Sequence, residues 1–258
     1  MQPTTQPPTT TQSSAFAQLF TQNVNYTMPG SVNSLKIFMI GGGGSGFGGH
    51  YGAGGAGYIT TVGIGQISKG TIISVVIGAG GGRTQTGNSS QSFEGQATTV
   101  TILGNTYTAK GGLSAVQNNS NGGNGSSGGG GAGNGGFGGN GGSGGSNGAR
   151  GNSYGGGVGM DTSAFQNAIN FIGKSVYNFR AGAGGEAGVS THSGGGGAGG
   201  IICDTVSYPI AENGGDTTSG KGGVGFGAGG GSGGYNINTY YYGGAGAPGM
   251  VYMFFTII

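Results

Sequence analysis

The tract that begins at Asn134 reads NGG FGG NGG SGG SNG ARG, so a residue other than glycine recurs at nearly every third position. A period of three is the repeat of a left-handed extended helix that rises about 3.1 Å per residue. Such a helix makes no internal hydrogen bonds, so its N–H and C=O groups need partners on neighbouring segments or in water. We therefore predict that residues 134–149 form an ordered helix packed against other glycine tracts. The alternative is a flexible linker, which has the same composition.

Other glycine-dense tracts alternate with short apolar segments along most of the chain. The tracts are 41–57, 78–82, 122–159, 182–200, 220–234 and 243–249. The segments between them are rich in β-branched and aromatic residues and end at Gly, Asn or Pro, which is typical of β-strands. We predict strands at 25–28, 35–40, 58–64, 71–77, 98–103, 106–109, 201–208 and 251–258, arranged as a small β-sandwich.

One segment, from Asp161 to Gly173, has the pattern of an α-helix. Asp161 is a suitable N-cap, and Gly173 a suitable stop. Apolar residues recur at the spacing of one helical face, at Phe165, Ala168, Ile169 and Ile172. The insertion 161–179 either covers an apolar edge of the fold or contacts a partner.

The composition argues against catalysis. Among 258 residues there are 73 glycines and 6 prolines, and only 5% are charged, with a net charge of +2. Collagen is excluded because its triple helix needs a strict Gly-X-Y repeat rich in proline. The charges are scattered, so we expect no nucleic-acid partner. His50, His192 and the sparse carboxylates form no recognisable catalytic or metal-binding pattern, so we expect no enzyme, no metal and no cofactor.

Gly44, Gly46 and Gly49 form a G-x-G-x-x-G pattern directly after the strand 35–40. A dinucleotide site would need a helix after these glycines and an acidic residue about 20 positions further on. Neither is present, so we do not expect a nucleotide. The only cysteine, Cys203, excludes an internal disulfide framework, and its apolar neighbours predict a buried structural role.

The first 14 residues form a Pro/Thr/Gln arm that precedes a predicted domain at 15–258. Pro3, Pro7 and Pro8 favour an extended conformation that could lie along an adjacent copy. We therefore expect the arm, with Phe16 and Phe20 just after it, to mediate assembly into a homo-oligomer or polymer. The N-terminus resembles no signal peptide. The longest apolar run, 250–258, is too short to span a membrane.

Tyrosine, serine, asparagine and glycine gather in two further segments, 175–179 and 235–242. These residue types are typical of binding loops, where tyrosine supplies rigid contact area. The candidate residues for recognition or for subunit contact are Tyr177, Phe179, Tyr235, Tyr240, Tyr241 and Tyr242. The alternative is that these rings stack on glycine faces inside the fold.

The stretch from Tyr26 to Gly46, YTMPGSVNSLKIFMIGGGGSG, resembles the start of a known domain. Further blocks agree in order: GAGGAGYITT at 52–61, KGTIISVVIGAGG at 69–81, TTVTILGNTYTAKGG at 98–112 and GGAGAPGMVYMFF at 243–255. The series is similar to the glycine-rich domain shared by virion and phage tail-fibre proteins and by ectodomains of anaplastic-lymphoma-kinase-type receptors. The Pro/Thr arm, the insertion and the low cysteine content depart from that pattern, and the last argues against a receptor ectodomain.

This resemblance implies a mainly β fold, a jelly-roll-like sandwich elaborated by packed left-handed polyglycine II helices. It also implies a structural or adhesive role rather than a catalytic one. We therefore expect a structural protein of a virion or extracellular surface, in a fibre, a capsid or a filament. The alternative is a receptor-binding adhesin that recognises a host-surface glycan or protein. The expected partners are copies of the chain, other virion proteins or a host receptor.

Overall fold

The computed structural model describes residues 15–49, 51–84, 93–115, 121–131, 162–173, 177–186, 194–215, 219–236 and 239–257. Several predictions from the sequence lie outside these residues. They concern the arm 1–14 with its three prolines, the period-three tract 134–149, and both histidines.

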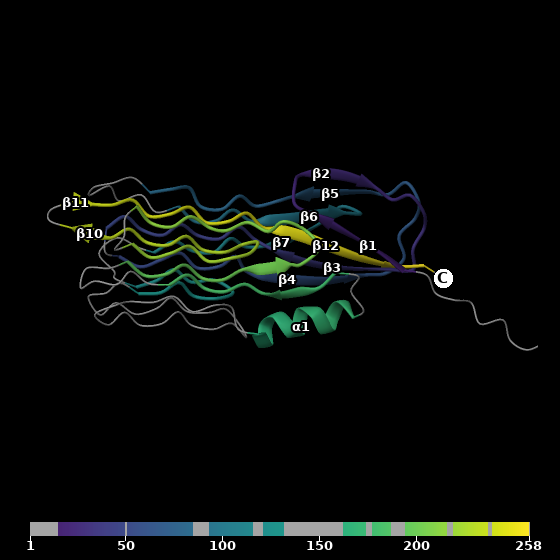
Figure 1. Cartoon of the computed structure of the whole chain (residues 1–258). Coiled ribbons are helices and arrows are strands. Elements are labelled where there is room, and N and C mark those ends of the chain that lie inside the picture. The colour runs from purple at the N-terminus through teal and green to yellow at the C-terminus, as the bar shows by residue number, and fades with distance from the viewer. Residues whose placement is uncertain are drawn as a thin grey trace, which may run out of the picture.

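Two antiparallel sheets of four strands form one end of the molecule (Figure 1). The first sheet contains, in order, β1 (Ala15–Phe20), β12 (Met250–Thr256), β3 (Ser34–Ile40) and β4 (Ile59–Ile64). The second contains β2 (Val24–Thr27), β5 (Ile72–Val76), β6 (Thr98–Ile102) and β7 (Asn105–Ala109). The order brings the first and last described strands, β1 and β12, side by side.

Alternating residues of the two sheets meet in a common apolar core. Strand β3 contributes every second residue, as the period of a strand requires. The buried members in the strands are Leu35, Ile37 and Met39 from β3, Val251, Met253 and Phe255 from β12, Ile73 and Val75 from β5, Val100 and Ile102 from β6, and Ala109 from β7. The predicted β-sandwich is therefore confirmed.

The opposite face of the first sheet packs against α1 (Thr162–Ile172). Ala168 and Ile172 of the helix are buried with Phe38 and Tyr252 of the sheet. The helix ends at Gly173, whose φ of 83° suits a residue without a side chain. Both the helix and its stop are confirmed, and its apolar face covers the sheet.

Five strands depart from the prediction. Strand β1 was not predicted, and its pairing with β12 over six residues explains its formation. The strand predicted at 201–208 is wrong beyond Cys203, because β9 (Ile201–Cys203) pairs over only three residues with β8 (Phe179–Ala181), which was not predicted either. Two short strands, β10 (Tyr235–Asn236) and β11 (Thr239–Tyr240), form an additional hairpin.

The glycine tracts leave the sandwich as extended rods that run side by side to the far end of the molecule (Figure 1). Several rods continue a strand directly, and the rod that begins at Gly41 follows β3. In the sheet Ile40 pairs with Ile59, and the same one-for-one register then continues in the hydrogen bonds from Gly41 to Tyr58 and from Gly44 to Gly55. The sandwich therefore sets the alignment of the rods that leave it.

The rod from Gly41 to Phe47 lies at the centre of the bundle, and its N–H groups donate to three different neighbours in rotation. Every third residue donates to the same neighbour. The donor–acceptor pairs are Gly41–Tyr58, Gly44–Gly55 and Phe47–Gly52; Gly42–Gln96 and Ser45–Phe93; and Gly43–Ala247 and Gly46–Gly244. This rotation shows a helix of three residues per turn.

The carbonyl groups of the central rod accept from three further segments. The N–H groups of Gly112, Gly81, Gly230 and Gly233 donate to Gly42, Gly43, Gly44 and Phe47, respectively, over 2.8–2.9 Å. The central rod therefore has six neighbours, three through its donors and three through its acceptors. This is the packing of polyglycine II helices, because a helix without internal bonds must place all its polar backbone groups on neighbours.

The rods are left-handed. A right-handed rod, the mirror image, would need φ near +75°. Among the described glycines, φ is positive only at Gly49, Gly70, Gly104, Gly173, Gly225 and Gly227, and none of these lies between Gly41 and Phe47. Close packing requires glycine within the rods: a Cβ at Gly43 would overlap the backbone carbonyl of Ala228.

Candidate functional site

The hairpin of β10 and β11, which carries Tyr235 and Tyr240, lies at the end of the rod bundle farthest from the sandwich (Figure 1). The rings of Tyr235 and Tyr240 pack across this hairpin with centroids 4.7 Å apart. Tyr240 also lies against Gly49, and the N–H of Gly49 donates to the carbonyl of Tyr241. The hairpin is therefore fixed to the end of the central rod.

An ion pair between Arg83 and Glu212 lies beside the ring of Tyr242. Nε of Arg83 donates to Oε2 of Glu212 over 3.0 Å, and the guanidinium lies 4.2 Å from the centre of the Tyr242 ring. The N–H of Ala245 donates to the same carboxylate oxygen. The hydrogen bond from Arg83 lowers the pKa of the Glu212 carboxyl below its usual range, and the same bond raises the pKa of Arg83. Three segments distant in sequence are joined here.

We call the half-buried rings at this end the tyrosine end: Tyr51, Tyr235, Tyr240, Tyr241 and Tyr242. Four of these five were predicted from the sequence as recognition or contact residues. Tyr51, which packs edge-on against Phe47 at 5.1 Å, was missed because it stands alone within a glycine tract.

The other predicted aromatic residues lie in the sandwich or against its outer face. Tyr177 and Phe179 pack edge-on against Tyr252, with ring centroids 5.5 and 5.0 Å away. Phe16 stacks on Phe255 at 4.5 Å, and Phe20 packs against the sandwich core of its own chain. The structure thus gives all four an internal packing role, and their part in contacts between copies stays a prediction.

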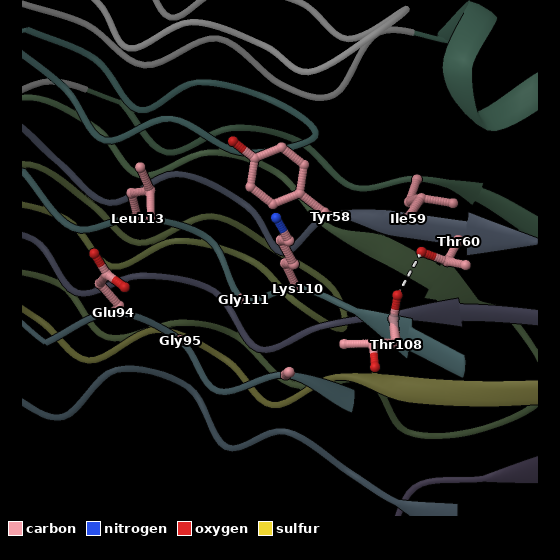
Figure 2. Close-up of a pocket in the computed structure, with 10 residues that line it drawn as sticks. Tyr58, Ile59, Thr60, Glu94, Gly95, Thr108, Lys110, Gly111 and Leu113 are labelled. Atoms are coloured by element: carbon pink, nitrogen blue, oxygen red, sulfur yellow. Dashed lines mark hydrogen bonds between the residues drawn. The ribbon is translucent and has the colours of Figure 1, made fainter. Parts of the chain in front are cut away.

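A second site lies on the side of the molecule where the strands pass into the rods. It is a pocket of about 730 Å³ beside the ends of β4 and β7 (Figure 2). Strand β4 approaches β7 at this point, and the hydroxyl of Thr60 donates to the carbonyl of Thr108 over 3.0 Å. The lining residues are Tyr58, Ile59, Thr60, Glu94, Gly95, Ala97, Thr108, Lys110, Gly111 and Leu113.

Charged residues are rare in this chain, and most of those described are paired. Three ion pairs join Arg83 to Glu212, Arg180 to Asp204, and Lys221 to Glu186. Lys36 donates to the carbonyl of Ile172. Glu94 and Lys110, both in the pocket, have no ion-pair partner within the described ranges.

Cys203 is fully buried, as its apolar neighbours predict, and its Sγ lies 3.3 Å from Oγ1 of Thr205. Over the residues that the structure describes, no cluster of three or more His, Cys, Asp or Glu could hold a metal ion. In the same residues no helix is long and apolar enough to cross a membrane.

A comparison with families of known proteins matches residues 19–256 to the glycine-rich domain. The match covers both sheets and the rods between them. The chain belongs to the glycine-rich domain family. No curated protein matches the chain.

In this glycine-rich domain, sequence reasoning identified most of the tyrosine end but neither Arg83 nor the pocket. Arg83 is a single charge after a glycine run, and only its position opposite Glu212 and Tyr242 reveals its role. Tyr58, Glu94 and Lys110 come from three separate segments. No local pattern connects them, so the pocket could be found only in three dimensions.

Proposed function

We propose that the protein is a non-enzymatic structural subunit that self-assembles into a virion surface fibre, a capsid component or an extracellular filament. The observation that supports this most is the rod bundle, in which backbone N–H and C=O groups form hydrogen bonds between neighbouring rods. Such a body offers rigidity rather than adjustable side chains. Rigidity is what a repeated building block needs.

The N-terminal arm is the proposed link between copies. It precedes β1, an edge strand that, among the described residues, pairs only with β12. Strand β1 has no charged residue and no proline, the usual features that keep an edge strand from pairing with another chain. An extended arm of 14 residues could reach about 40 Å along a neighbour at about 3.1 Å per residue.

Sedimentation velocity and electron microscopy of the full chain test this proposal. We expect large ordered assemblies from the full chain, and mostly single subunits from a variant that begins at Ala15. An unchanged melting temperature for the single subunits would show that the deletion affects assembly only. Normal assemblies without residues 1–14 would contradict the role of the arm, and a full chain that stays monomeric would contradict the structural function.

The tyrosine end favours a second candidate function, a receptor-binding adhesin. The hairpin of β10 and β11, which carries the half-buried Tyr235 and Tyr240, lies at the extremity of an elongated body. Tyr240→Ala should then weaken binding to receptor-bearing cells, whereas Tyr208→Ala, at an exposed ring elsewhere, should leave it unchanged. Equal binding by both variants would count against this candidate.

A further inference from the structure

The pocket beside β4 and β7 has the size and the chemistry of a small-ligand site. Its volume of about 730 Å³ lies within the range of about 300–1,000 Å³ that is common for such sites. Aromatic, aliphatic, charged and hydroxyl side chains all line it. This region has no part in the proposed assembly through the arm.

The register of the rods places the two charged residues apart along the pocket. Strands β6 and β7 pair Thr98 with Ala109, and the N–H of Gly95 donates to the carbonyl of Gly112 in the same register. Glu94 therefore lies level with Leu113, and Lys110 lies three residues further along. At about 3.1 Å per residue, the two positions are about 9 Å apart along the rods.

Tyr58 stands at the Lys110 end of this pocket. The N–H of Tyr58 donates to the carbonyl of Lys110 over 2.8 Å, and Figure 2 shows the Lys110 side chain beneath the Tyr58 ring. The ring is only partly buried, so part of it faces the pocket. The pocket thus offers an aromatic surface and an ammonium group at one end and a carboxylate toward the other.

This arrangement selects a ligand by charge. A phosphate or another anion would gain from Lys110 but would be repelled by Glu94, and a cation would meet the reverse. A ligand without net charge, able both to donate and to accept hydrogen bonds, satisfies both groups. The hydroxyl groups of a sugar do both, and the C–H face of a sugar ring packs well on an aromatic ring.

We propose that this pocket binds a neutral saccharide longer than one ring. The Tyr58 ring carries one sugar ring, the Lys110 ammonium donates to its hydroxyl groups, and the Glu94 carboxylate accepts from a hydroxyl further along the chain. Gly95 and Gly111 line the pocket with backbone, because a Cβ at either position would meet the backbone of a neighbouring segment. The site is separate from the tyrosine end.

Titration calorimetry of the full chain with neutral trisaccharides (maltotriose, cellotriose and triacetylchitotriose) tests the proposal. We expect at least one of them to bind, and we expect Lys110→Met, Glu94→Gln and Tyr58→Leu each to weaken that binding at least about tenfold. Lys69→Met is the matched control, since Lys69 is exposed, outside the pocket and without an ion pair among the described residues. Lys110 and Glu94 are exposed, so their variants should keep the melting temperature even if Tyr58→Leu does not fold.

Absence of binding by all three saccharides at millimolar concentration would overturn the proposal. So would binding that none of the pocket variants affects, or that Tyr240→Ala abolishes, because the saccharide would then occupy the tyrosine end. A change in sedimentation of the pocket variants without a change in saccharide binding would instead assign the pocket to contacts between copies. Failure of assembly alone leaves saccharide binding intact, so the two proposals fail independently.

Discussion

The sandwich and the rod bundle are stabilised in opposite ways. In the sandwich, large side chains such as Phe255 and Met39 are removed from water, and burial of apolar surface stabilises the fold. In the bundle, a side chain at most of the glycine positions would overlap the backbone of a neighbouring rod, and hydrogen bonds between backbones hold the rods together. One region therefore depends on side-chain volume, and the other on its absence.

The largest expected effect of a single methyl group lies in the central rod. In Gly43→Ala the new Cβ would overlap the backbone of Ala228, and the hydrogen bonds from Gly43 to Ala247 and from Gly81 to Gly43 would be strained. Each buried group left unpaired costs about 1–3 kcal/mol. Because the total stability of a domain is only about 5–15 kcal/mol, we expect no cooperative unfolding transition by circular dichroism.

The matched control is Gly65→Ala, because a Cβ at Gly65 has nothing within 4 Å. Its melting temperature should equal that of the wild type or rise slightly. If Gly43→Ala behaved like Gly65→Ala, the close packing of the rods would not be needed for stability.

In the sandwich the expected effect comes from removing volume rather than adding it. Phe255 is fully buried and stacks on Phe16, so Phe255→Ala should destabilise the protein by about 3–5 kcal/mol in urea unfolding. Phe93→Ala is the comparison, since the ring of Phe93 is exposed and lies beside a rod. A similar loss in both variants would contradict the assignment of the sandwich as the side-chain core.

A smaller effect is expected at the end of α1. Gly173 has a φ of 83°, which costs a residue with a side chain about 1–2 kcal/mol. Gly173→Ala should lower stability by about this amount, whereas Gly173→Asn should lower it less. Equal stability of the wild type and Gly173→Ala, measured by thermal unfolding, would show that the helix end adapts.

The smallest expected effect is on the stability of the protein at low pH. The folded protein lowers the pKa of Glu212, so the contribution of this carboxylate is complete above its unfolded pKa of about 4.3 and is lost as the pH falls through the lower folded value. Both members of the pair with Arg83 are about half exposed, so the contribution is at most about 1 kcal/mol. Glu212→Gln should remove this part of the acid dependence in urea unfolding measured between pH 7 and pH 3.

Local sequence patterns identified strands and the helix wherever the spacing of apolar side chains reflects which face of the element is buried. The alternation in 71–77 and 98–103 indicated two strands of the second sheet, and the helical spacing of Ala168, Ile169 and Ile172 indicated α1. The short strands β8, β10 and β11 were missed because two or three residues carry too little pattern. Strand β1 was missed because its formation depends on pairing with β12, more than 200 residues away.

The sequence by itself determined that β-branched strands alternate with glycine tracts, because both are visible in the residue types. The packing of the tracts as three-residue helices was implied by the family resemblance, since the tract with a visible period of three, 134–149, lies outside the described residues. Only the tertiary structure decided which rods form hydrogen bonds with each other. Every glycine N–H has the same chemistry, and glycine has no side chain that could select a partner. The strands make that choice: the pairing of Ile40 with Ile59 and of Met250 with Ile40 continues unchanged into the rods. The pocket of Tyr58, Glu94 and Lys110 follows from the register of β6 with β7 and from the hydrogen bond of Tyr58 to Lys110, which bring three separate segments to one place.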